Sequence, residues 1–142
     1  MTRTMARRTQ AGAMLLEALI ALLLFAIGVI GLVAMQANAT RLAAESKYRA
    51  EAATYADQII SQMWADDRSN ANLTARYATG GDKYEAWKNR IQAAGSGLPG
   101  TTLAGNAPTV VIDANNVVTV TIFWQGPNVE APHRHVTVAQ VN

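Results

Sequence analysis

The sequence predicts an α+β protein in which one long amino-terminal helix packs, through its second half, against a small antiparallel β-sheet. Three observations lead to this fold class. Residues 13–35 are apolar with a single charge, residues 36–65 contain neither Gly nor Pro, and from Thr109 apolar residues alternate with a period of two. With 142 residues, the chain has room for one globular domain of ordinary size.

The first segment, residues 1–12, is short, polar and basic, and it contains no acidic residue. Its basic residues are Arg3, Arg7 and Arg8. An ordinary secretory signal places its small-residue cleavage site after an apolar core of about 7–15 residues. Here the small residues Ala11-Gly12-Ala13 come before a longer apolar run. Cleavage after Gly12 would therefore remove the basic leader and leave the apolar helix on the mature protein.

Residues 13–35 predict a membrane-spanning helix. At about 1.5 Å per residue the run is about 35 Å long, which is enough to cross a hydrocarbon core of about 30 Å. Its single charge is Glu17. A carboxylate in this position costs about 2.5–3.5 kcal/mol on insertion scales, and such residues normally have a function. By the positive-inside rule, the leader stays in the cytoplasm and the rest of the chain is exported.

Residues 36–65 predict an amphipathic continuation of the same helix, because they are rich in Ala, Gln, Glu, Lys and Arg. An apolar stripe recurs at three- and four-residue spacing. It consists of Tyr48, Ala52, Tyr55, Ala56, Ile59 and Met63. This stripe needs another element to cover it.

Residues 66–142 are expected to form the globular head. Asp66–Gly81 predicts a loop, because Asp, Ser, Asn and Gly are frequent in it. Asp82 and Glu85 match a capping box at the start of a helix that stops at Gly95. Residues 95–108, with four glycines and two prolines, predict an irregular linker.

Three antiparallel strands are expected after the linker: Thr109–Asp113, Val117–Trp124 and His135–Val141. Asn115 and Asn116 suit a tight hairpin between the first two, because Asn tolerates positive φ. The second strand places Val118, Val120, Ile122 and Trp124 on one face. The third strand places Val136 and Val138 on one face.

The leader–helix junction reads Gln10-Ala11-Gly12-Ala13-Met14-Leu15-Leu16-Glu17. It resembles the class III signal of type IV pilins and the related pseudopilins, which combine a basic leader, a Gly before the cut, a Glu five residues after it and an apolar helix. Within that group, Leu-Glu-Ala-Leu-Ile-Ala followed by Ile27-Gly28-Val29-Ile30-Gly31-Leu32 looks like the minor pilins called type IV pilus modification protein PilV. The strand Thr119–Trp124 and the Val-rich last strand are also similar.

The resemblance implies a type IV pilin fold and a role for each matching residue. Gly12 matches the residue after which a membrane-embedded prepilin peptidase cuts. Ala13 matches the new amino terminus, which the same enzyme methylates. Glu17 matches the buried glutamate that pairs with the free amine of a neighbouring subunit.

The same resemblance implies a single-pass precursor in the bacterial inner membrane, with a periplasmic head, that later joins the pilus at the cell surface. Its partners would be the peptidase, membrane lipid, other minor pilins and the major pilin, and adhesion is among the outputs of such fibres. Ala13 stands where Phe is common, and Ala34 stands where major pilins often carry Pro. With the absence of cysteines, these departures favour a minor subunit.

Other classes of function are not supported by the residues. Without the leader, the chain has nine basic and ten acidic residues, so the pI of about 9.2 does not indicate nucleic-acid binding. The absence of cysteines excludes Cys-type zinc sites and thiol chemistry. His133 and His135 share a strand face but have no evident third ligand, so no metal is expected. No nucleophile–base pair or phosphate loop appears, so we expect neither an enzyme nor a cofactor nor a small-molecule substrate.

Two alternatives remain open at this point. A minor pseudopilin of a type II secretion system would share the same signal. A membrane-anchored periplasmic binding or enzymatic domain would use residues 13–35 as an uncleaved anchor. Trp87 and Trp124 could then offer a binding surface, although core packing is the favoured interpretation.

Overall fold

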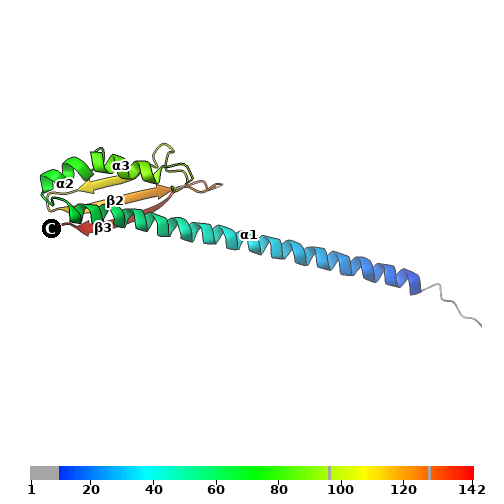
Figure 1. The fold of residues 1–142 in the computed structure, drawn as a ribbon. Helices are drawn as coiled ribbons and strands as arrows, with labels where there is room; N and C mark the ends of the chain where they lie inside the picture. The colour runs from blue at the N-terminus through cyan, green and yellow to red at the C-terminus, as the bar shows by residue number, and fades with distance from the viewer. Residues whose placement is uncertain (1–9, 96, 128) are drawn as a thin grey trace, which may run out of the picture. The chain divides into compact units, whose positions relative to one another are not determined.

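The computed structural model describes residues 10–95, 97–127 and 129–142. They belong to two compact units, which divide between Ala43 and Ala44. The helix α1, Gln10–Ala65, has 56 residues and contributes to both units (Figure 1). The prediction of one uninterrupted helix from the apolar run to residue 65 is therefore confirmed. Residues 1–9, with the three leader arginines, lie outside the described residues.

The second unit contains all the other elements in the described part of the chain. Two short helices follow α1, namely α2 (Asn70–Tyr77) and α3 (Asp82–Ile91). Three antiparallel strands then form a sheet in the order β1-β2-β3 (Figure 1). Their bounds are Thr109–Ile112, Val117–Trp124 and His133–Gln140. The α+β class and the three-stranded sheet are confirmed.

The core of this unit joins one face of the sheet to all three helices. Its members from α1 include most of the predicted stripe: Ala52, Ala56, Ile59 and Met63 are fully buried, and Tyr48 and Tyr55 are partly buried beside them. The predicted inner face of β2 is also buried, namely Val118, Val120, Ile122 and Trp124. Burial of these two apolar surfaces against each other removes both from water, which is the main favourable term in folding.

The helix α2 is a correction, because its residues were expected to form a loop. Ser69 caps it by accepting a hydrogen bond from the Asn72 N–H at 3.4 Å. Leu73 and Tyr77, one turn apart, are buried in the core. Asn and Thr have low helix propensity, so packing of this apolar pair, rather than composition, stabilises the helix.

The start of α3 is a second correction, because no capping box forms there. Gly81 is the N-cap and offers no side chain, and Asp82 is already inside the helix. A Cβ on Gly81 would lie 2.2 Å from the Arg76 carbonyl oxygen, so only glycine fits at the cap. The helix also ends at Ile91, before the predicted stop at Gly95.

The hairpin between β1 and β2 forms as predicted. Asn116 has a φ of 57°, the left-handed conformation that asparagine tolerates. The Asp113 carboxylate accepts hydrogen bonds from the N–H groups of Asn115 and Val117, both at 2.8 Å. This turn fixes the register in which Val110 lies opposite Val120.

Strand β3 begins earlier than expected, at His133, and turns its two valines outward. His133 pairs with Trp124 in the register, and their rings stack with centroids 5.7 Å apart. Val136 and Val138 do share a face, but they are opposite Thr121 and Thr119, on the face of the sheet away from the core. They are therefore 46% and 62% exposed.

Candidate functional site

The predicted cleavage site lies on α1, which is described from Gln10 onward. A Cβ on Gly12 would meet no atom within 4 Å. Packing against the described residues therefore gives no reason for glycine at this position.

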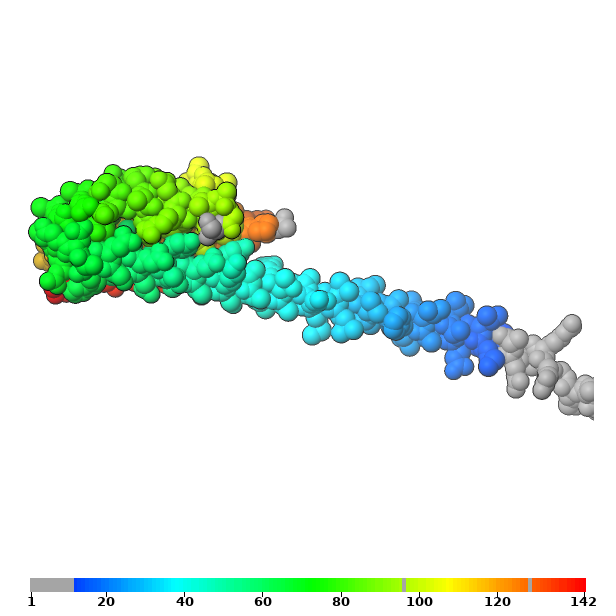
Figure 2. All heavy atoms as spheres, in the orientation of Figure 1, coloured from blue at the N-terminus to red at the C-terminus, as the bar shows by residue number. Residues whose placement is uncertain are grey.

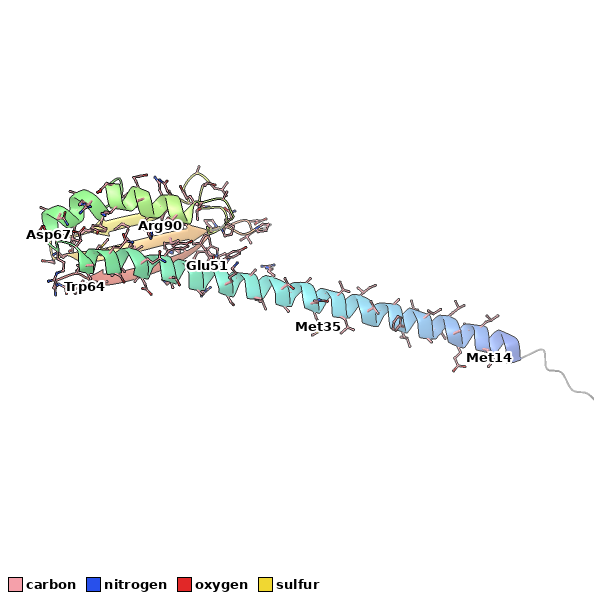
Figure 3. All side chains as sticks on the ribbon, viewed as in Figure 1. Met14, Met35, Glu51, Trp64, Asp67 and Arg90 are labelled. Atoms are coloured by element: carbon pink, nitrogen blue, oxygen red, sulfur yellow. The ribbon has the colours of Figure 1, made fainter. Side chains whose placement is uncertain are left out.

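The first unit presents an apolar surface on every side of α1. Large apolar side chains from Met14 to Met35 are 40–73% exposed. Figure 2 draws this stretch of α1 as spheres, and Figure 3 labels Met14 and Met35 on it. This stretch is long and apolar enough to cross a membrane, by its length and composition. A helix that is apolar all round is stable only in an apolar environment, which is lipid or other helices.

Glu17 is the one acidic residue within this apolar surface. It is exposed, and no residue in the described part of the chain forms an ion pair with it. It lies one turn after Ala13, so the two are neighbours on one helix face. The structure thus places Gly12, Ala13 and Glu17 together, within two turns of one helix.

The two histidines of β3 face the core side of the sheet and have separate partners. His133 Nδ1 lies 3.8 Å from a Glu45 carboxylate oxygen on α1. His135 Nε2 lies 2.8 Å from the Thr137 hydroxyl. The described residues contain no group of three or more His, Cys, Asp or Glu side chains that could hold a metal ion.

Both tryptophans that could have formed a binding surface are in the core. Trp87 and Trp124 are 0% and 1% exposed. The Trp87 indole donates a hydrogen bond to the Tyr55 carbonyl oxygen at 2.9 Å, which ties α3 to α1. The core interpretation is therefore confirmed for both residues. The tryptophan that does remain at the surface is Trp64, 46% exposed, with the Arg68 guanidinium 5.7 Å from its ring centre (Figure 3).

A polar cluster at the end of α1 was not predicted. The Asp66 carboxylate accepts hydrogen bonds from Arg76 at 2.8 Å and from the Tyr77 hydroxyl at 2.9 Å. Arg76 also reaches Asp82 at 3.4 Å, so the cluster connects the residue that follows α1 to α2 and α3. We name Asp66, Arg76, Tyr77 and Asp82 the helix clasp. Its sequence signal was weak, because the partners are up to 16 residues apart in a segment interpreted as a loop.

The clasp changes the acidity of its members. Hydrogen bonds from the Asp67 N–H and the Tyr77 hydroxyl, with the nearby Arg76 charge, lower the pKa of Asp66. Burial, together with the hydrogen bond to the Asp66 carboxylate, raises the pKa of Tyr77 to about 12. At neutral pH, Asp66 is therefore an acceptor and Tyr77 a donor, as the geometry requires.

The second unit also carries a shallow groove of about 260 Å³. It is bordered by Lys47, Tyr48 and Glu51 on α1 and by Gly95, Gly97 and Pro99 after α3. Lys47 and Glu51 form an ion pair at 3.7 Å across its edge. Such an exposed pair contributes little free energy, and these residues offer no nucleophile with a base beside it.

Comparison of the chain with protein-family models, with curated proteins and with solved structures finds no match.

Proposed function

We propose that this chain is the precursor of a minor pilin of a type IV pilus, with a pilin fold. In this proposal a prepilin peptidase cuts between Gly12 and Ala13, and the mature chain joins a fibre with other minor pilins and the major pilin. It helps to initiate or modify the pilus through subunit packing, not through catalysis.

The observation that carries the proposal is the order of features along α1. A small-residue site precedes an apolar helix, and a lone carboxylate follows that site by one turn. A plain membrane anchor needs neither feature. Gly12 packs against no other described residue, which supports recognition of this residue by another protein.

Glu17 gives the assembly step a physical basis. Hydrolysis of the Gly12–Ala13 amide adds water, leaving a carboxylate on Gly12 and an amine on Ala13. That amine is positive at neutral pH and begins the mature helix. Pairing between this amine on one subunit and Glu17 on the next lowers the cost of both charges in an apolar setting. The pair would favour assembly and help to set the axial stagger between subunits.

Removal of the leader gives the extraction step a similar basis. The three arginines of residues 1–12 hold the amino terminus in the cytoplasm before the cut. After the cut, the mature chain carries nine basic and ten acidic residues and loses this anchor. The apolar surface of α1 can then exchange lipid contacts for helix contacts in a fibre.

The test is the intact mass of the membrane-extracted protein, expressed with and without a prepilin peptidase. We expect loss of residues 1–12 and gain of one methyl group on Ala13, only when the peptidase is present. Gly12→Val should block this change, whereas Gly28→Val, also at a glycine with open space around it, should not. A full-length chain in both samples would make Gly12 incidental and favour the uncleaved anchored domain.

A pseudopilin of a type II secretion system would pass the mass test as well. Recovery of the mature chain in sheared pili separates the two, because the proposal places it in that fraction. Recovery with a secretion pseudopilus instead would move the chain to the other class.

A further inference from the structure

The sheet of the second unit has two edges, β1 and β3, and a loop of the chain bonds to the first of them. Along β1, the Val110 N–H donates to the Thr79 hydroxyl at 2.9 Å. The Val110 carbonyl oxygen accepts from the Thr79 N–H at 3.0 Å and from its hydroxyl at 3.1 Å. The loop between α2 and α3 thus covers the outward polar backbone groups of Val110 on this edge strand, one of the ways in which natural sheets protect an edge.

Along a strand, backbone N–H and C=O groups point alternately to one neighbouring strand and to the other side. This alternation shows which backbone groups of β3 point out from the edge of the sheet instead of toward β2. Because Val110 turns its N–H and C=O away from β2, its neighbours on β1 bond to Thr119 and Thr121. The residues of β2 that alternate with Thr119 and Thr121 must therefore direct their backbone N–H and C=O groups to β3. Their partners on β3 are His133, His135, Thr137 and Ala139. The intervening residues point their N–H and C=O outward: Arg134, Val136, Val138 and Gln140.

Among the described residues, nothing bonds to this second edge along the length of β3. No residue in the described ranges donates to or accepts from those outward backbone groups through a contact outside the sheet. The pairing of β3 with β2 is one-to-one from His133 to Gln140, without a bulge, and the strand contains neither Gly nor Pro. The devices that usually protect an edge strand from pairing are therefore missing from β3, apart from one charge, Arg134.

We propose that the open edge of β3 binds an extended segment of another polypeptide as a fourth strand. The outward backbone groups would supply its hydrogen bonds. Val136 and Val138 are both exposed, and they favour β-branched side chains at the facing positions of the incoming strand. Arg134 forms no ion pair with any described residue, so it favours a carboxylate on the incoming strand.

A second copy of the chain fits this edge less well. Glu45 lies near His133, and Arg68 donates to the carbonyl oxygen of Asn142, so the end of α1 runs in the same direction as β3. An antiparallel pair of β3 strands would turn the ends of the two α1 helices in opposite directions. In the register that pairs all four outward residues of each strand, Arg134 would lie opposite Gln140, which offers it no negative charge.

The test uses the full chain in detergent micelles and a fluorescein-labelled synthetic peptide. In this peptide Val alternates with Thr and the last residue is Glu, which antiparallel pairing places opposite Arg134. A control peptide ends in Lys. We expect saturable binding by fluorescence anisotropy, with the Glu peptide binding about tenfold more tightly than the Lys peptide, which corresponds to about 1.4 kcal/mol.

Three variants locate the binding site. Val136→Pro removes an outward N–H but no hydrogen bond to β2, and Val138→Lys adds a charge that protects edges. Each should weaken binding by about tenfold. Val111→Lys is the matched control, because Val111 is on the same face of the sheet but on the opposite edge strand, β1, and is 61% exposed against 62% for Val138.

Amide hydrogen exchange of the unchanged chain gives an independent readout. The amides of Val136 and Val138 should exchange rapidly in the free chain, that of Thr137 slowly, and the peptide should slow the first two. Absence of binding, equal effects of Val138→Lys and Val111→Lys, or unchanged exchange would each overturn the proposal. So would self-association that Val138→Lys abolishes, because a second copy would then occupy the edge.

Discussion

The substitution Leu73→Ala tests the part of the core that the sequence did not predict. Leu73 lies on α2 and is 0% exposed. Truncation to alanine removes three buried carbons, and at about 0.8 kcal/mol each the lost transfer free energy is about 2.4 kcal/mol. The cavity that remains adds a further cost, because the clasp and the sheet hold the surrounding side chains in place. We expect the free energy of unfolding to fall by about 3–4 kcal/mol.

Leu103→Ala is the matched control for this prediction. Leu103 is in the same unit but 51% exposed, so the same truncation should cost less than about 1 kcal/mol. Urea unfolding of the full chain in micelles can be followed by tryptophan fluorescence. All three tryptophans, at 64, 87 and 124, belong to the second unit, so the apolar half of α1 does not contribute to the signal. The slope m of the unfolding free energy against urea concentration should be equal in the two variants. A difference below about 1 kcal/mol between their free energies of unfolding would then refute the packing of α2.

Two further predictions concern charged groups. The proposed function predicts that Glu17→Ala leaves membrane insertion and cleavage unchanged but reduces incorporation into pili, because the proposed partner of the Ala13 amine would be lost; normal amounts in a pilus shearing assay would contradict this. Asp66, whose pKa is lowered below its ordinary 3.8, contributes stability that is fully present above that value and is lost as the pH falls through the lowered pKa. Thermal melting points should therefore decline less between pH 5 and 2 in Asp66→Asn than in the unchanged chain, and parallel declines would argue against the clasp.

Periodic patterns in the sequence predicted most of the architecture. The apolar stripe of α1 was predicted because residues such as Ala52, Ala56 and Ile59 recur at helical spacing over many turns. The strand β2 was predicted because its alternation is unbroken from Val117 to Trp124. A long pattern contains many residues on the same face of the helix or strand, so one residue that does not fit leaves the periodicity recognisable.

Features that depend on tertiary contacts were not predictable in the same way. The helix α2 has eight residues, too few for periodicity to outweigh its asparagines. The cap at Gly81 follows from the close approach of the Arg76 carbonyl group, which involves a residue outside α3. The outward direction of Val136 follows from the register with β2, in which it lies opposite Thr121. Each feature depends on a contact with a residue outside the element, which the local sequence pattern cannot predict.

The two halves of α1 are subject to different physical constraints, although they form one helix. From Met14 to Met35 the large apolar side chains are exposed, so this segment requires apolar character and good helix propensity. Ala52 and Ala56, in contrast, are fully buried, and a larger side chain there would have to displace the sheet. The first half is therefore constrained by hydrophobicity and the second by volume. Glu17 is the exception within the first half, because hydrophobicity alone would exclude it, and the ion pair proposed for it would account for its presence.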